Sequence, residues 1–124
     1  MSSFSEKQEH QRKLKQEYGW LYESLTQILA KDDPMNLVRI GAPDNEYKWE
    51  VDEILLKLNE ANSPEELGDI IYAVFVSAFG KSFASRGELS YQQYKPRFQA
   101  LGETAWNEWM RWKEEKKEGE ASKE

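Results

Sequence analysis

Residues 63–66, Ser-Pro-Glu-Glu, constrain the fold of this chain more than any other short stretch. The serine can cap a helix that begins at the proline, and the glutamate three positions after the serine can reach back to the cap amide. The apolar run over 70–79 contains enough β-branched residues to suit a buried strand. The capping box and the unbroken length favour a helix instead, ended by Gly80 as its left-handed residue. Because this run is apolar on nearly every side, we expect it in the middle of the fold.

Apolar residues at three- and four-residue steps predict three further helices. The first spans about 5–30 with Gly19 as a mild defect, another begins near Asp44 or Asn45, and the last starts near Pro96. The side chains expected inside are Leu14, Tyr18, Leu21, Tyr22, Leu25, Ile28 and Leu29, then Tyr47, Val51, Ile54, Leu55 and Leu58, and finally Phe98, Leu101, Ala105, Trp109 and Trp112, with Trp106 and Met110 beside them. The spacing predicts an all-α, single-domain bundle of about four main helices, with a long structured connection after the first.

The two ends of the chain carry no apolar stripe that would hold them against a core. We therefore predict a flexible N-terminal segment over 1–9, followed by a helical domain over 10–112. Residues 113–124 are mostly lysine and glutamate, so we expect a charged, disordered tail there.

The connection over 32–47 is long for a compact domain, and such connections often have a role of their own. Asp33 and Asp44 suit helix caps, and Glu46 suits the positive end of a helix dipole. Arg39 has two readings: it can brace the connection by pairing with a carboxylate, or it can present its guanidinium to an anionic ligand. We expect a shaped connection whose main role is binding.

Composition narrows the chemistry that the chain can perform. A net charge of −6 disfavours nucleic acid as a partner, because proteins that bind nucleic acids usually show a basic patch, and it suggests a basic partner instead. The chain has no cysteine and a single histidine, His10, so disulfides and thiolate zinc sites are excluded. Residues 1–7 lack the apolar core of a secretory signal, and the longest apolar run is too short to span a membrane. We expect a cytoplasmic protein that does not bind membranes.

Several motifs follow one another in a defined order along the chain. They are Asp33-Pro34, Gly41-Ala42-Pro43-Asp44-Asn45-Glu46-Tyr47, Ile54-Leu55, Ser63-x-Glu65-Glu66-Leu67 and Ile70-Ile71-Tyr72-x-Val74-Phe75, ending at Phe79-Gly80. This combination resembles the DUF1871 family, small helical proteins of unknown function found mostly in Firmicutes, over about residues 28–80. The resemblance implies a helical fold in a bacterial, cytoplasmic setting, and it implies no catalytic residues.

An acidic cluster over 32–52 raises the question of metal binding. Its members are Asp32, Asp33, Asp44, Glu46, Glu50 and Asp52. Mg²⁺ and Ca²⁺ prefer carboxylate oxygens, but the spacing matches neither a calcium-binding loop nor the Glu-x-x-His pairs of di-iron bundles. A divalent-metal-dependent enzyme or binding module therefore stays as the alternative function. We assign no catalytic residue, no cofactor and no metal ligand.

Three tryptophans near the C-terminus can either enter the core or dock a partner, since aromatic rings dominate both kinds of contact. Trp109 falls on the predicted stripe and is expected in the core. For Trp106 and Trp112 the sequence does not decide between a place in the core and contact with a partner.

The favoured function is that of a small, acidic, non-enzymatic protein that binds another protein. Adaptor, antitoxin-like and immunity-like roles all suit its size and charge, and the chain would be a monomer or a homodimer. The candidate partner-binding residues are Asp32, Arg39, Asp44, Glu46, Trp106 and Trp112.

Overall fold

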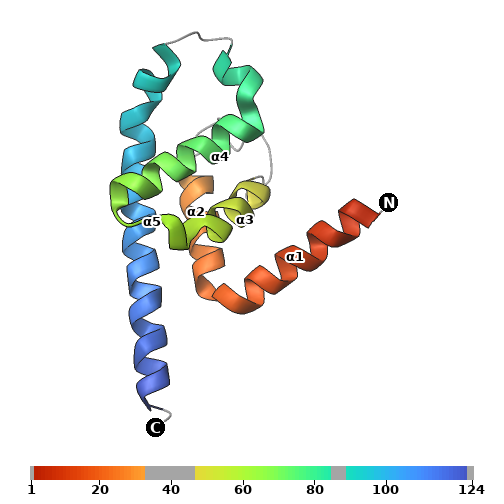
Figure 1. Ribbon diagram of the computed structural model, residues 1–124, viewed down its shortest axis with the longest axis vertical. Helices are drawn as coiled ribbons and strands as arrows, with labels where there is room; N and C mark the ends of the chain where they lie inside the picture. The colour runs from red at the N-terminus through yellow and green to blue at the C-terminus, as the bar shows by residue number, and fades with distance from the viewer. Residues whose placement is uncertain (1, 33–46, 85–88, 123–124) are drawn as a thin grey trace. The chain divides into compact units, whose positions relative to one another are not determined.

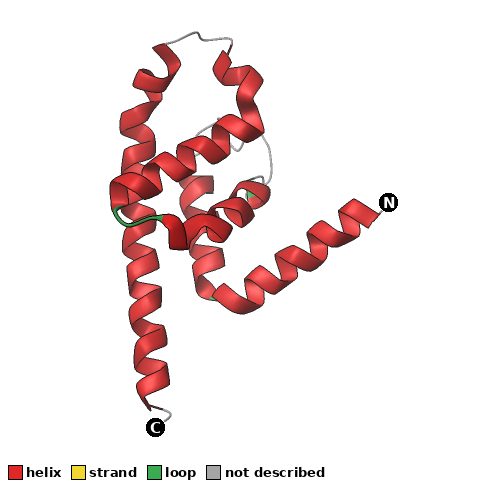
Figure 2. Ribbon diagram, in the orientation of Figure 1, coloured by secondary structure: helices red, strands yellow, loops and turns green. Residues whose placement is uncertain are grey.

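The structure is a computed structural model that describes residues 2–32, 47–84 and 89–122. The described chain is helical throughout and holds no strand, so the predicted all-α fold is confirmed (Figure 2). Five α-helices and one short 3-10 helix follow one another: α1 (Ser2–Tyr18), α2 (Trp20–Asp32), α3 (Lys48–Lys57), η1 (Leu58–Glu60), α4 (Pro64–Ala84) and α5 (Leu89–Ser122) (Figure 1). Within these ranges no helix is both long enough and apolar enough to cross a membrane.

The chain divides into two compact units, Met1–Leu56 and Lys57–Glu124. The first unit holds α1, α2 and nearly all of α3, and the second holds η1, α4 and α5. The boundary falls at the end of α3 within a run of mostly apolar residues. No change of composition therefore marks it in the sequence.

A break at Gly19 divides the first predicted helix into α1 and α2, so the prediction of one helix over 5–30 is wrong. Gly19 has a φ of +54°, in the left-handed region that residues with a Cβ rarely adopt. Its amide donates to the Lys15 carbonyl at 2.8 Å, and its carbonyl accepts from the Tyr22 amide at 3.1 Å. The chain therefore changes direction at a single residue without losing these hydrogen bonds (Figure 1).

The apolar positions predicted for the first unit are buried, with one exception. Leu14, Tyr18, Leu21, Tyr22, Leu25 and Leu29 are buried in α1 and α2, as are Tyr47, Val51, Ile54 and Leu55 in and before α3. Ile28 is only half-buried. The Tyr18 hydroxyl donates to the Leu55 carbonyl at 3.5 Å, which links α1 to α3.

The capping box predicted for residues 63–66 is present, with one difference. The Ser63 hydroxyl oxygen accepts from the Glu66 amide at 3.1 Å, as expected. The Glu66 carboxylate accepts at 3.1 Å from the amide of Asn62, one residue before the cap. Both side chains thus satisfy amides that the start of α4 leaves without a helical partner.

Helix α4 is longer and less enclosed than the sequence predicts. It continues through Gly80 to Ala84, so Gly80 does not end it. Ala73, Ser77 and Ala78 are exposed, which contradicts the expectation of a helix buried on every side. Because these residues are small, the exposed face is weakly apolar although the sequence of the helix is not amphipathic. The buried side consists of Leu67, Ile71, Val74 and Phe75.

Helices α4 and α5 cross closely at two glycines. A Cβ added to Gly102 would lie 2.6 Å from the Gly68 Cα and 2.6 Å from the Pro64 carbonyl oxygen. A Cβ added to Gly68 would lie 3.0 Å from the Phe98 carbonyl oxygen. The two backbones therefore approach so closely that only glycine fits at Gly102.

Helix α5 is continuous over 34 residues, so the predicted start near Pro96 is wrong. Pro96 lies inside the helix at an exposed position, where its missing amide removes one hydrogen bond without ending the helix. Residues 113–122, which we expected to be a disordered tail, belong to the same helix. Lysine and glutamate are strong helix formers, which explains the extension.

The buried face of α5 follows the prediction as far as Trp109. Phe98, Leu101, Ala105 and Trp109 are buried. The Phe98 ring packs against the rings of Tyr72 and Phe75 on α4, with centroids 5.3 and 5.5 Å apart. Met110, which we expected to widen this stripe, is 42% exposed.

Candidate functional site

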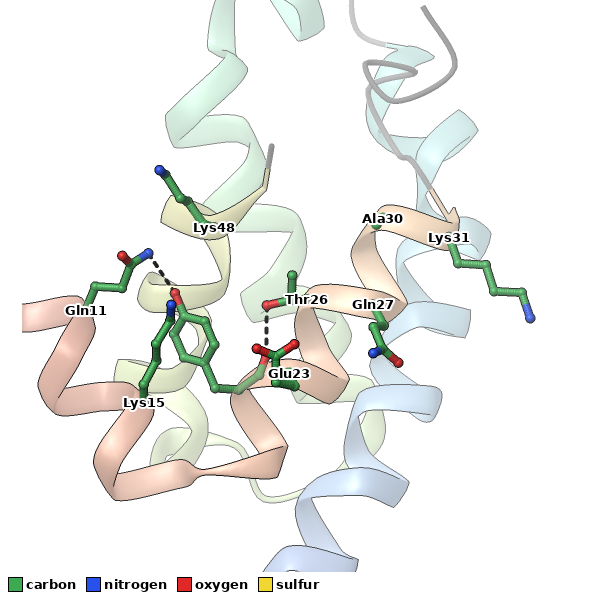
Figure 3. A pocket seen from close by; sticks show the side chains of 9 residues that line it. Gln11, Lys15, Glu23, Thr26, Gln27, Ala30, Lys31 and Lys48 are labelled. Carbon is green, nitrogen blue, oxygen red and sulfur yellow. Dashed lines mark hydrogen bonds between the residues drawn. The ribbon is translucent and has the colours of Figure 1, made fainter. Parts of the chain in front are cut away.

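A cavity of about 610 Å³ opens in the first unit beside α1, α2 and the start of α3 (Figure 3). It is lined by Gln11 and Lys15 of α1, by Tyr22, Glu23, Thr26, Gln27, Ala30 and Lys31 of α2, and by Lys48 of α3. Its volume is within the range of ordinary ligand sites. Its lining is mostly polar, however, whereas ligand pockets are mostly apolar. Of the described lining residues, Ala30 alone has a side chain without a polar atom.

The concave shape follows from the local sequence. On α1 the lining residues are four positions apart, and on α2 they come in pairs at four-residue steps, so each set shares one face of its helix. On a straight helix these positions would form a flat stripe. The left-handed turn at Gly19 folds the stripe into a concave surface, and Lys48 of α3 completes it (Figure 3).

Tyr22 lines the cavity and connects all three helices of the unit. The Gln11 side-chain amide donates to the Tyr22 hydroxyl oxygen at 2.8 Å, and this hydroxyl donates to the Asp52 carboxylate at 2.9 Å. Both Tyr22 and Asp52 are buried. A buried hydroxyl and a buried carboxylate thus satisfy each other, which avoids the cost of an unpaired polar group.

Burial also shifts the ionisation of this pair. It raises the pKa of the Asp52 carboxyl above its usual value of 3.8, although the hydrogen bond from Tyr22 acts in the opposite direction. Burial, and after it the hydrogen bond to Asp52, raise the pKa of the Tyr22 phenol well above its usual value of 10. The phenol is therefore uncharged at neutral pH and stays a hydrogen-bond donor to the carboxylate.

In the described part of the chain, three ammonium groups and one carboxylate, that of Glu23, border the cavity. The Lys15 ammonium lies 5.3 Å from the centroid of the Tyr22 ring, and the Lys48 ammonium lies 5.1 Å from that of Trp49. Figure 3 shows Lys15 and Lys48 at one end of the lining and Lys31 at the other. Within the described ranges no ion pair joins these three lysines to a carboxylate. The ring contacts of Lys15 and Lys48 do not neutralise their charges, so all three ammonium groups can still attract an anionic group.

Hydrogen bonds inside the protein already occupy several polar groups of the lining. The Thr26 hydroxyl donates to the Tyr22 carbonyl at 2.8 Å, and the Tyr22 hydroxyl donates to Asp52. The donors left for a ligand are therefore the ammonium groups and the side-chain amides. The acceptors left are the Glu23 carboxylate and the amide oxygens of Gln11 and Gln27.

Of the candidate residues in the long connection, the structure describes one. Asp32 is half-buried and ends α2, directly after the last residue that this helix contributes to the cavity. Lys48 begins α3 after the other end of the connection, so the chain leaves and re-enters the described structure beside the cavity. Arg39, Asp44 and Glu46, with the helix caps expected there, lie outside the described residues.

The tryptophans gather on α5, in the second unit. Trp109 is 3% exposed, as its predicted core position requires, and its ring stacks on that of Trp112 with centroids 5.6 Å apart. The ammonium groups of Lys113 and Lys116 lie 5.1 and 5.2 Å from the centroids of Trp109 and Trp112, respectively. Trp106 and Trp112 are half-buried, so each ring keeps an accessible part.

The acidic cluster is only partly described. Glu50 and Asp52 are buried, with 7% and 8% of their surface exposed. In the part of the chain that the structure describes, no three carboxylate or histidine side chains are grouped so that they could hold a metal ion.

Sequence reasoning missed the cavity and the role of Asp52. One signal was available: Tyr22 falls on the buried stripe, and a buried tyrosine hydroxyl usually finds a hydrogen-bond partner. The partner lies 30 residues further along the chain, however, and nothing local points to it. The three lysines belong to three helices whose meeting depends on the unforeseen turn at Gly19.

Comparison of the chain with protein-family models, with curated proteins and with solved structures found no match. Function is therefore inferred from the residues and the geometry described above.

Proposed function

We propose that this chain is a non-enzymatic protein that binds another protein, with the cavity face of its first unit as the binding surface. The observation that carries the proposal is the set of lysines around the cavity, whose charges pair with no carboxylate of the described residues. Charged groups at a protein surface make binding specific when the partner supplies groups of the opposite charge. Asp32 directly follows Lys31 of the lining, which supports Asp32 as a contact residue.

The geometry favours binding over catalysis because the titratable groups of Tyr22 and Asp52 are engaged with each other. A general base must be within reach of a substrate proton and have a pKa near the working pH. Asp52 is buried beneath Tyr22 and accepts its hydroxyl, and the raised pKa of Tyr22 keeps the phenol protonated. Both residues therefore stabilise the first unit and leave recognition to the lysines above them.

The biological setting is part of the same proposal. The ordered motifs over residues 28–80 support membership of the DUF1871 family, and with it a bacterial cytoplasmic protein. An adaptor, antitoxin-like or immunity-like role suits a small protein that presents charged groups to a partner.

A pull-down with the tagged chain, read by mass spectrometry, tests the proposal. We expect a specifically retained protein that is lost when Arg39, Asp44 and Glu46 are all replaced by alanine, since these residues belong to the stretch of sequence between Asp32 and Lys48. The matched control replaces Trp106 and Trp112 on the other unit, and it should keep the partner.

Two results would contradict this assignment. Loss of the partner only in the tryptophan variant would move the binding surface to α5. Absence of any protein retained above a tag-only control would contradict protein binding as such.

A further inference from the structure

The charge of the cavity is opposite to that of the unit around it. Residues 1–56 carry seven basic and eleven acidic side chains, a net charge of −4. Among the described residues, the cavity lining has three lysines and one glutamate, a net charge of +2. Asp52 behind the Tyr22 hydroxyl reduces this excess without cancelling it. Because salt screens charges beyond about 8 Å at physiological ionic strength, a ligand in the cavity responds mainly to the lining.

We propose that the cavity receives the carboxylate side chains of an extended acidic segment of the partner protein. The inference rests on the proposed function, because it takes the partner to be a protein. It adds the chemistry of the segment that the partner presents. The net charge of the whole chain suggests a basic partner, whereas the charge of this face suggests an acidic one.

The donors of the lining favour recognition of negative charge. The hydroxyls of Tyr22 and Thr26 already donate within the protein, so the neutral side-chain donors left in the described lining are the amides of Gln11 and Gln27. The three ammonium groups remain, and hydrogen bonds from an ammonium to a carboxylate are stronger than neutral ones. Lys15 and Lys48 lie at one end of the lining and Lys31 at the other, so the ammonium groups are not gathered at one point (Figure 3).

The acceptors of the lining favour a peptide over a free anion. Glu23 and the amide oxygens of Gln11 and Gln27 can accept hydrogen bonds, and inorganic anions such as sulfate have no proton to donate at neutral pH. A peptide offers a backbone N–H at every residue except proline, as well as its acidic side chains. The volume of about 610 Å³ gives room for a short stretch of chain.

Fluorescence anisotropy with a labelled Gly-Glu-Glu-Gly-Glu-Glu peptide tests this chemistry directly. We expect the peptide to bind the full chain, and binding to weaken as salt is added, since the contacts are exposed ion pairs. The matched peptide with glutamine in place of glutamate should bind at least about tenfold more weakly.

Two triple variants of equal charge separate the cavity from general electrostatics. Replacing Lys15, Lys31 and Lys48 by glutamine should weaken binding of the glutamate peptide about tenfold, because each exposed ion pair contributes little by itself. The control replaces Lys13, Lys57 and Lys117, which lie outside the lining, by glutamine. It should bind the glutamate peptide as tightly as the wild type does.

A single variant keeps the test valid if the triple variant folds poorly. Glu23→Gln removes the one carboxylate that the described residues contribute to the lining, and it retains an acceptor. It should therefore tighten binding of the glutamate peptide, whereas loss of fold would weaken it.

Several outcomes would overturn the inference. They are equal weakening in both triple variants, equal affinity for the glutamate and glutamine peptides, and weaker binding by Glu23→Gln. Displacement of the peptide by an equal concentration of inorganic sulfate would also overturn it, because it would indicate a site for free anions. A partner captured equally by the wild type and by the variant in Lys15, Lys31 and Lys48 would overturn this inference and leave the proposed function standing. Binding of the glutamate peptide with no protein captured in the pull-down would contradict the proposed function instead.

Discussion

At the scale of single residues, Tyr22 joins the stability of the first unit to the shape of its cavity. Its hydroxyl lies between Gln11 of α1 and Asp52 of α3, and its ring lies under the Lys15 ammonium. One side chain thus holds three helices together and supports one of the cations on the cavity rim. The burial of Tyr22 is predictable from its position on the apolar stripe. The choice of Asp52 as its partner is not, because it depends on how α3 packs.

The Tyr22→Phe variant should lower the free energy of unfolding by about 1–3 kcal/mol. It leaves the buried Asp52 carboxylate and the Gln11 amide without their hydrogen bonds, while the ring still packs. Urea denaturation followed by circular dichroism measures the change. Tyr18→Phe is the matched control and should cost less, since the Tyr18 hydroxyl makes a longer bond of 3.5 Å. Equal losses in the two variants would contradict a special role for Tyr22.

Asp52 should make the wild type less stable as pH rises through the acid range. Burial raises its pKa in the folded state above the usual 3.8, so the folded chain holds this proton more tightly than the unfolded chain does. The contribution of Asp52 to folding is therefore most favourable below pH 3.8 and declines as pH rises through the folded pKa.

The measurement compares the free energy of unfolding of the wild type with that of Asp52→Asn between pH 3 and 7. Asparagine can still accept the Tyr22 hydroxyl but does not ionise. The stability of the wild type relative to this variant should fall as pH rises. A difference that stays constant or grows with pH would show that the folded-state pKa is not raised.

At the scale of helices, two positions require glycine for different physical reasons. Gly19 needs its positive φ and has no neighbouring atom within 4 Å of an added Cβ, whereas Gly102 lies in a helix and has no room for one. The sequence reveals neither reason, because a glycine in a helical pattern reads only as a weak point. The capping box at residues 63–66 was predictable because its signal is confined to four neighbouring residues. The extent of α5 was not, because a continuous helix overrides the local effect of Pro96.

Gly19→Ala should destabilise the chain by about 1–2 kcal/mol, entirely through the left-handed backbone. Thermal unfolding by differential scanning calorimetry measures the loss. Gly119→Ala is the matched control: this glycine lies in helix α5, also with no atom within 4 Å, and alanine there should be neutral or stabilising. Destabilisation of similar size at both positions would show that the turn at Gly19 is not the cause.

Gly102→Ala should destabilise the chain by roughly 1–3 kcal/mol, because its Cβ would press on the backbone of α4 at Gly68 and Pro64. Gly68→Ala should cost less, since its nearest contact is 3.0 Å and a small shift relieves it. Urea denaturation of both variants measures the order of these losses. A tolerated Gly102→Ala would mean that α4 and α5 do not cross as closely as described.

At the scale of the whole molecule, charge is the dominant surface property. The net charge of −6 is shared between a first unit at −4 and a second at −2. Composition therefore predicts an acidic protein correctly, yet it hides the basic lining of the cavity, since an average over many residues cannot show a local excess. This is why the sequence suggests a basic partner and the cavity an acidic one.

Raising the salt concentration from near zero to about 0.15 M should increase the free energy of unfolding, because it screens repulsion within the acidic chain. Urea denaturation at several salt concentrations measures this slope. The variant in Lys13, Lys57 and Lys117, with a net charge of −9, should show a steeper increase. A stability that falls with salt in both proteins would show that attractive ion pairs outweigh the repulsion.

The crossing of α4 and α5 at Gly68 and Gly102 also bears on how this chain can evolve. Lysines on a cavity rim can be exchanged as a partner changes, since their side chains are not enclosed by other parts of the protein and none of the three makes an ion pair with a carboxylate of the described residues. Where the backbones of α4 and α5 are in contact, substitution is much more restricted, because only the hydrogen side chain of glycine fits at Gly102. A pair of glycines 34 positions apart, bracketing a helical hairpin, should therefore persist after most other similarity has been lost, and it offers a pattern by which distant relatives can be recognised.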